Sequence, residues 1–189
     1  MPNFRLFRLP ALLLLALLLH GCALQTPPYS PSANVLDRIR NGGTKPVALG
    51  AFTVKPGAQG ANSISLRGNP MASSVGADYA AYLAEALRVE LQIAGKLDPR
   101  STLEISGELQ GTDIAAGGLS TNTGFVEARF VVKSAGQVRY DAVKRADATW
   151  DSSFVGAIAI PKAQQQYPVL VQQLLAALWA DERFLAALK

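Results

Sequence analysis

The sequence predicts an α+β fold, a two-layer sandwich in which two helices cover one face of a mixed four-stranded sheet. Apolar residues recur at steps of two in four segments, which is the period of a strand, and at steps of three and four in two others, which is the period of a helix. The order along the chain is strand, helix, three strands, helix. Of the 189 residues, those from 44 to 189 are expected to form this single domain, a common size for one core.

The first 21 residues have the composition of a secretory signal peptide. Arg5 and Arg8 supply its positive charge, and residues 9–19 are an apolar run of the length expected for the centre of such a peptide. This run is too short to span a bilayer. The residues that follow resemble the lipobox of bacterial lipoproteins, namely Leu19, His20, Gly21 and Cys22.

The lipobox resemblance implies that Cys22 begins the mature chain and carries lipid. Cys22 is the only cysteine, and an exported protein with one unpaired thiol needs an explanation, which acylation supplies. Two or three acyl chains hold a protein on a membrane where one binds only reversibly. Ala23 stands where lipoproteins of the inner membrane often have Asp, so the resemblance favours the periplasmic face of the outer membrane, with the inner membrane and the cell surface as alternatives. A secretory signal with an incidental cysteine is the competing interpretation.

Residues 22–43 are expected to be a lipidated N-terminus followed by an extended tether. The prolines at 27, 28 and 31 follow no period, and the segment ends in two glycines. Residues 34–40 could form one or two turns of helix, docked loosely on the domain at best.

The domain begins with a strand, a long loop and a helix. Alternating apolar residues predict the strand at 44–54. The loop after it is rich in Gly, Ser and Asn and carries a short strand near 63–67. The helix is predicted at 77–94, with Asp78 or Ser74 as its N-terminal cap.

Three strands are predicted next, at 102–112, 125–133 and 138–150. A three-residue turn with Gly136 in the left-handed conformation is expected between the last two strands, and this turn pairs Val132 with Val138. Lys144 then falls on the apolar face. Either a bulge near 143–145 intervenes, or the Lys144 side chain extends along the sheet edge to water.

The C-terminal part predicts a second helix that covers the sheet. We expect a loop over 151–160 and a helix that begins at Pro161. Pro168 lies too deep for a first turn, which predicts a kink or a restart there. A last helical turn at 181–188 is expected to fold back on the core.

The residue types needed for common catalytic sites are absent from the mature sequence. The only histidine is His20, which leaves with the leader. We therefore expect no zinc set of His and Cys, no other metal or cofactor, no serine or cysteine triad, and no enzymatic activity. Glycan hydrolysis needs only two carboxylates, and Glu104, Glu108 and Asp113 lie near one strand, but their alternation with apolar residues favours a solvated sheet face.

Two further patterns concern loops. The glycine-rich stretches at 57–68 and 117–124 do not have the spacing of a phosphate-binding loop, which favours flexible connections. Residues 150–156 place paired serines between aromatic residues. Because no base is at hand to activate a serine, we interpret this segment as a turn that docks the sheet on the second helix, with a binding role as the alternative.

The charges offer one candidate contact surface. The formal charge of +4 falls to about +2 once Arg5 and Arg8 are removed, too little to indicate nucleic acid. The candidates for contact with an anionic partner, such as lipid headgroups or lipopolysaccharide phosphates, are Lys133, Arg139, Lys144 and Arg145. An ordinary charged sheet face is the competing interpretation, because Asp141 and Asp147 are interspersed among them.

The lipobox, the proline-rich segment and the order of elements resemble small bacterial envelope lipoproteins. They are similar to the lipopolysaccharide-assembly lipoprotein, the auxiliary lipoproteins of lipid-moving ABC transporters and YajG-type lipoproteins, although only residues 19–22 match as a motif. Residues 79–95 and 150–161 also resemble uncharacterised proteobacterial lipoproteins. The resemblance implies a non-enzymatic accessory or binding subunit in envelope assembly or transport, with the membrane and an envelope protein as partners. A direct binder of lipid or glycan, which needs a sizeable apolar cavity, and a hydrolase that uses carboxylates alone are the alternatives.

Overall fold

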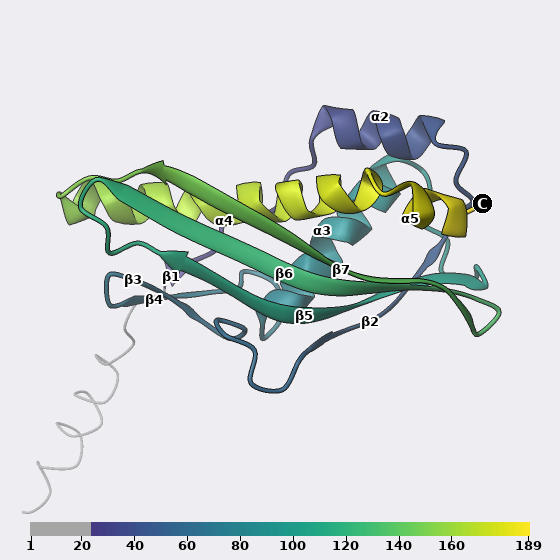
Figure 1. Cartoon of the computed structure of the whole chain (residues 1–189), viewed down its shortest axis with the longest axis horizontal. Coiled ribbons are helices and arrows are strands. Elements are labelled where there is room, and N and C mark those ends of the chain that lie inside the picture. The colour runs from purple at the N-terminus through teal and green to yellow at the C-terminus, as the bar shows by residue number, and fades with distance from the viewer. Residues whose placement is uncertain (1–23) are drawn as a thin grey trace, which may run out of the picture.

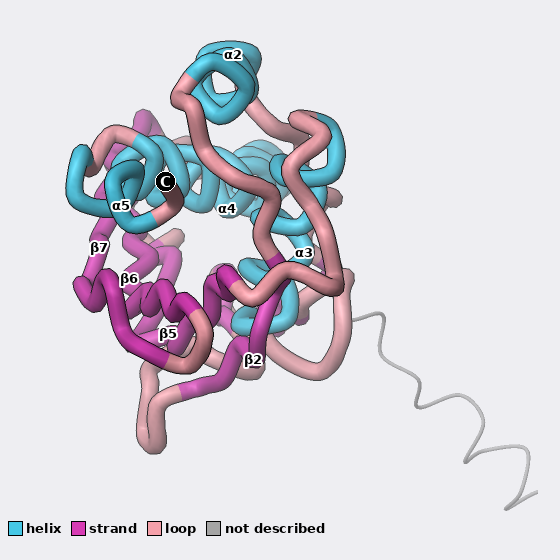
Figure 2. The backbone as a smooth tube through the Cα atoms, turned by 90° about the vertical axis from the view of Figure 1, so that its right-hand side faces the viewer, coloured by secondary structure: helices cyan, strands magenta, loops and turns pink. Residues whose placement is uncertain are grey.

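The structure, a computed structural model, describes residues 24–189 and is a mixed α+β arrangement (Figure 1). Its main sheet has the order β2-β5-β6-β7. The strands are β2 (Ala48–Val54), β5 (Leu103–Ala115), β6 (Thr121–Ser134) and β7 (Gln137–Asp151). The helices α3 (Tyr79–Ile93) and α4 (Gly156–Trp179) lie on one side of this sheet (Figure 2). The predicted α+β sandwich with a mixed four-stranded sheet is therefore confirmed.

The first strand joins the sheet through a helical crossover, as expected. β2 runs parallel to β5, and α3 lies between them in the sequence, whereas β5, β6 and β7 pair antiparallel. Alternate residues of β5 are buried against the helices. Among them Gly107 leaves room for the ring of Phe52 on β2, because a Cβ atom there would lie 2.5 Å from that ring. The strand alternation thus separates a helix-covered face from an uncovered one.

A small second sheet has the order β1-β4-β3. Its strands are β1 (Leu24–Gln25), β3 (Ile64–Leu66) and β4 (Asn69–Ala72). Only β3 is predicted by the sequence pattern. Arg67 and Gly68 form the two-residue turn between β3 and β4, and both have positive φ, 55° and 84°. Turns of this kind match the twist of the strands they join.

The N-terminal segment corrects the expected tether at 22–43, because the described part of it is packed on the domain. The helix α2 (Ala33–Asn41) buries Val35 and Ile39. Upstream, the backbone amide of Thr26 donates to the carbonyl of Ala72 at 2.9 Å. The helix agrees with the turns expected at 34–40, although it is packed and not loosely docked. The contacts of the residues before it come from β1 pairing and from side chains of α3 and α4 that bond their backbone, so the sequence pattern does not reveal them.

The hairpin between β6 and β7 has a different register from the predicted one. Its turn has two residues, so Ser134 pairs with Gln137, and a bulge near Lys133 follows. Val132 therefore pairs with Tyr140 and not with Val138, whose side chain is 58% exposed. The register differs by two residues along most of the hairpin, an even number, and so the predicted inward and outward faces are retained.

The second helix begins earlier than predicted. α4 starts at Gly156, five residues before Pro161, and continues through Pro168 without a restart. Ala159, Ala163 and Tyr167 extend its buried stripe toward the N-terminus. This packing holds the helix together where the prolines remove backbone hydrogen bonds. The last helix, α5 (Glu182–Ala187), packs on the core as predicted.

The layer between helices and sheet is filled by large side chains. Trp179, Tyr167 and Phe130 are completely buried there. Glu90 of α3 is the one carboxylate among the buried residues of the described chain, and it accepts hydrogen bonds from Trp179 and Tyr29.

Within residues 24–189, no helix has both the length and the apolar character needed to cross a membrane.

Candidate functional site

The uncovered face of the main sheet is the candidate functional site. Three long antiparallel strands, β5, β6 and β7, place alternate side chains on this face. Two shallow grooves lie on it, with volumes of about 360 and 310 Å³. They lie at different places along the strands, so the face offers an extended surface rather than one enclosed pocket.

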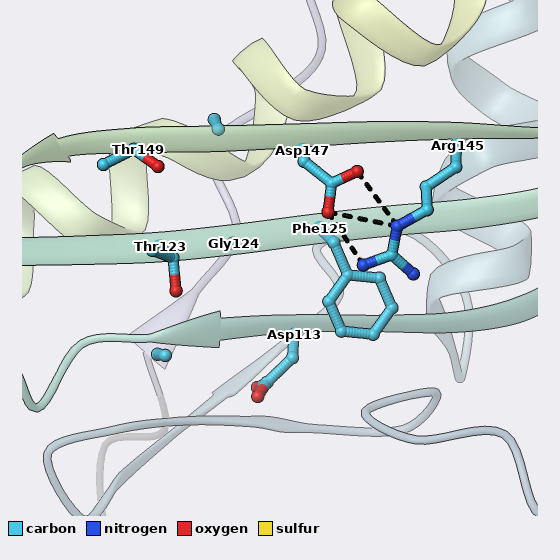
Figure 3. A pocket seen from close by; sticks show the side chains of 9 residues that line it. Asp113, Thr123, Gly124, Phe125, Arg145, Asp147 and Thr149 are labelled. Carbon is cyan, nitrogen blue, oxygen red and sulfur yellow. Dashed lines mark hydrogen bonds and ion pairs between the residues drawn. The ribbon is translucent and has the colours of Figure 1, made fainter.

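The first groove is built around Phe125 of β6 and Arg145 of β7 (Figure 3). The guanidinium carbon of Arg145 lies 4.1 Å from the centre of the Phe125 ring, which is a cation–π contact. Arg145 also donates to Asp147 at 2.7 Å and to Glu127 at 3.3 Å. This hydrogen bonding holds the pKa of Asp147 below its ordinary value. The Arg145 side chain is thus fixed by an aromatic ring and two carboxylates.

The other wall of the first groove is polar and small. Asp113 of β5 accepts a hydrogen bond of 2.9 Å from Gln59 in the loop after β2. Thr123 and Thr149 line the groove from β6 and β7 (Figure 3). The groove therefore offers hydroxyl groups and one aromatic ring to a partner, while its arginine is already engaged.

The second groove lies between β2, β5 and β6 and is strongly charged. Arg129 and Lys133 line it opposite Glu104 and Glu108. Arg129 also bonds Asp141 of β7, with a distance of 2.7 Å between Nε and Oδ1. This hydrogen bond lowers the pKa of Asp141.

Carboxylates outnumber cations among the charged side chains that line the two grooves or pair with the groove cations. The cations in its two grooves are Arg129, Lys133 and Arg145. The carboxylates in these grooves or bonded to these cations are Glu104, Glu108, Asp113, Glu127, Asp141 and Asp147. This excess favours a partner that brings positive or polar groups over one that brings phosphates.

The structure separates the four basic residues expected to meet an anionic partner. Lys133 and Arg145 lie in different grooves of the uncovered face. Arg139 borders a hollow of about 140 Å³ at the end of the sheet, beside Lys45 and Lys189. The expected single basic cluster is thus not formed, because the register and the strand alternation distribute its members.

Lys144 has neither of its two expected arrangements. It pairs in register with Ala128, so no bulge lies there, and its ammonium is paired with a carboxylate. It forms an ion pair of 2.7 Å with Asp181, next to α5, and both side chains are less than 20% exposed. Lys144 and Arg183 hold the pKa of Asp181 well below its ordinary value.

The carboxylates considered for hydrolysis lie in a row along β5. Glu104 and Glu108 are four residues apart on a strand, which separates their backbones by about 13 Å. Catalytic carboxylates of glycosidases are about 5–10 Å apart. Glu108 accepts a hydrogen bond from Gln110, and Asp113 accepts one from Gln59.

In the part of the chain that the structure describes, no group of three His, Cys, Asp or Glu side chains is placed to hold a metal ion.

The serine-containing segment at 150–156 serves a structural purpose. The Ser152 hydroxyl and the Ser153 carbonyl accept hydrogen bonds from Arg67, at 3.3 and 2.8 Å. Sequence reasoning missed Arg67, since an arginine in a two-residue turn gives no periodic signal. It also missed Glu90, although Glu90 lies in phase with the apolar stripe of α3, which was a usable signal.

The predicted lipidation site, Cys22, and the lipobox residues Leu19, His20 and Gly21 lie outside the described residues.

Comparison with known proteins gives distant similarities of structure. No family model matches the chain, and no curated protein matches it. The chain is similar to the crystal structure of protein XCC0632 from Xanthomonas campestris, which carries the family description DUF330, with a TM-score of 0.46 and 14% identity over 84% of this chain and 92% of that one. It is also similar to the hypothetical protein CT253 from Chlamydia trachomatis, with a TM-score of 0.45 and 12% identity over 77% of this chain and 99% of that one.

Proposed function

We propose that this protein is a membrane-anchored lipoprotein of the bacterial envelope, a non-enzymatic accessory that binds a protein partner in envelope assembly or transport. Lipid on Cys22 would hold it at the periplasmic face of the outer membrane, with the inner membrane or the cell surface as alternatives. The signal peptide and the lipobox pattern support the anchor.

The observation that carries the binding role is the uncovered face of β5, β6 and β7. It combines two open grooves with charged side chains whose positions are fixed by one another. A broad, shallow surface that mixes polar and apolar groups in this way suits a protein partner, since small ligands are usually bound in deeper and more enclosed clefts. The acidic excess would steer a basic partner to the face.

The alternative of a direct lipid or glycan binder has less support. That function needs an apolar cavity large enough for a ligand. The layer in which such a cavity would lie, between the helices and the sheet, is occupied by Trp179, Tyr167 and Phe130.

Site-specific photo-crosslinking in intact cells tests the binding face. A photoreactive phenylalanine analogue would replace Thr123 or Val143 on the uncovered face, and Gln92 on the exposed side of α3 would serve as the matched control. We expect a protein adduct of one defined mass from both face positions and not from position 92. The same adduct from all three positions, or none from the face positions, would contradict this binding surface.

The anchor is tested separately with a fatty acid that carries a clickable alkyne. The wild-type chain should incorporate it and sediment with membranes, and Cys22→Ser should do neither. Membrane retention of Cys22→Ser at the wild-type level would show that the attachment is of another kind.

A further inference from the structure

We propose that the end of the domain nearest the N-terminus inserts apolar side chains into the surface of the bilayer that carries the lipid anchor. We call this end the apolar tip and define it as Leu119, Phe154, Val155 and Ile158. The inference rests on the proposed lipidation of Cys22 and adds a second, direct contact between protein and membrane.

The apolar tip is unusually exposed. Leu119 and Phe154 are 70% and 80% exposed, and Val155 and Ile158 are 52% and 58% exposed. Among residues 24–189, eight large apolar side chains are exposed, and these four belong to only two neighbouring loops and the first turn of α4. Single exposed apolar residues are ordinary, but a group at one place marks a contact surface.

Arg67 joins the two loops of the tip into one rigid unit. Its guanidinium donates to the carbonyls of Ala116 and Gly118 in the β5–β6 loop, at 2.8 and 3.0 Å. It also donates to the carbonyls of Ser153 and Phe154, at 2.8 and 3.1 Å. One side chain therefore holds together the backbone of the two loops that carry Leu119 and Phe154.

The start of α4 favours an apolar contact over a solvated end. Val155 occupies the N-cap position and provides no side-chain hydrogen bond to the helix. Polar caps such as Ser or Asp stabilise helix starts in water. Phe154, Val155 and Ile158 instead give this helix end an apolar surface.

The first described residue, Leu24, lies at the same end of the domain. Leu24 pairs with Met71 of β4, and β4 starts directly after the turn that contains Arg67. Because β1 is parallel to β4, the N-terminal end of β1 faces this turn. Figure 1 shows β1, the β3–β4 turn, the β5–β6 loop and the start of α4 at one end of the molecule.

Only two residues of sequence separate the proposed anchor, Cys22, from the first described residue, Leu24. Two residues span at most about 7 Å. From Leu24 onward, side chains of two helices bind the backbone of the N-terminal segment. Gln164 of α4 donates to the carbonyl of Gln25 at 2.5 Å, and Tyr82 of α3 donates to the carbonyl of Pro27 at 2.8 Å. Acyl chains on Cys22 would therefore draw this end of the domain, with its exposed apolar side chains, against the bilayer.

A fluorescent probe on single-cysteine variants tests the contact. The lipid consumes the thiol of Cys22, so a new cysteine is the only reactive one in the mature lipidated protein. Phe154→Cys places the probe in the apolar tip. Val138→Cys is the matched control. Val138 is also apolar and is 58% exposed, but it lies at the start of β7, next to the turn that joins β6 and β7. Both would be labelled with an environment-sensitive dye and reconstituted in vesicles of phosphatidylethanolamine and phosphatidylglycerol.

The probe at position 154 should shift its emission to shorter wavelength in vesicles. It should also become at least threefold less accessible to aqueous iodide than the same probe on the unlipidated Cys22→Ser chain in detergent-free solution, where position 154 again carries the only thiol. The probe at position 138 should not change. Leu119→Cys should repeat the result of Phe154→Cys, which guards against a local effect of one substitution.

The possible failures are distinguishable. If the lipidated protein floats with vesicles but the probe at 154 stays accessible, the tip contact is wrong and the anchor stands. Protection of the probe at 154 from iodide in the absence of vesicles would mean that a second copy of the chain covers the tip. Equal protection of the probes at 138 and 154 in vesicles would mean that the domain has another orientation on the bilayer. Either result would overturn the inference. Absence of lipid on Cys22 would instead remove the proposed function on which it rests.

Discussion

The indole nitrogen of Trp179 on α4 donates a hydrogen bond of 2.7 Å to the buried carboxylate of Glu90 on α3. The other oxygen of Glu90 accepts a hydrogen bond from Tyr29 in the N-terminal segment. One carboxylate thus joins both helices and the chain that leads to the proposed anchor. Burial raises the pKa of Glu90 to about 7, and the two hydrogen bonds oppose this rise only in part.

Glu90 should make the free energy of unfolding depend on pH. The pKa of a carboxyl in the unfolded chain is about 4.3, so the folded state binds the proton more tightly. Stability from this group is therefore highest at low pH and declines as the pH rises from about 4.5 to 7, by up to about 3 kcal/mol. Urea unfolding of wild type and Glu90→Gln at pH 5 and pH 7.5 measures this decline. Equal pH dependence of the two proteins would contradict the assignment.

Removal of the Tyr82 hydroxyl should loosen the N-terminal segment. Tyr82→Phe deletes the hydrogen bond to the Pro27 carbonyl and should cost about 1 kcal/mol. The amide of Thr26, which is bonded to Ala72, should then exchange its hydrogen several-fold faster. Tyr140→Phe is the control, since its hydroxyl bonds Asp181 on the far side of the domain. If both variants changed Thr26 exchange alike, the effect would be global and not a release of this segment.

Loss of the Arg67 guanidinium should destabilise the tip. Arg67→Ala leaves four carbonyls without their donor and should lower the free energy of unfolding by about 2–3 kcal/mol. Arg67→Lys should restore little, because an ammonium cannot match the planar donor geometry. Thermal unfolding checks the loss, with Arg88→Ala on the exposed side of α3 expected to change little. Full stability of Arg67→Lys would show that charge alone suffices.

The ion pair of Lys144 and Asp181 should stabilise the fold at neutral pH and not in acid. Because the folded pKa of Asp181 is depressed, its stabilising contribution is present above the unfolded pKa of about 4 and is lost as the pH falls through the folded pKa. Lys144→Gln should therefore unfold more easily than wild type at pH 7, with a smaller difference near pH 2.5. A difference that stays constant between these values would mean that Lys144 acts by packing.

Sequence periodicity predicted the elements that bury a continuous apolar stripe. α3, β5, β6 and β7 were found within a few residues because the contrast between their faces is strong. α4 extended beyond its prediction because a buried stripe prevailed over the local preference of Pro161. The packed segment at 24–32 was not predictable in this way, since it is held mainly by β1 pairing and by side chains of distant helices bonded to its backbone.

The candidate site was predicted only in part. The strand predicted at 125–133 includes Phe125, but the contact of Arg145 with this ring depends on the hairpin register, which a two-residue turn and a bulge set. The glycine at position 136 suits both a two-residue and a three-residue turn, so its presence did not distinguish between them. Lys144 found its partner Asp181 37 residues away, a distance in sequence that no local pattern covers.

Whether lipid on Cys22 holds this domain at the membrane can be measured as the mass of the mature N-terminal peptide, purified from membranes. We expect a chain that begins at Cys22 and is heavier than its sequence by a diacylglyceryl group and a further acyl chain. An unmodified thiol on Cys22, or a chain that keeps residues 1–21, would contradict it.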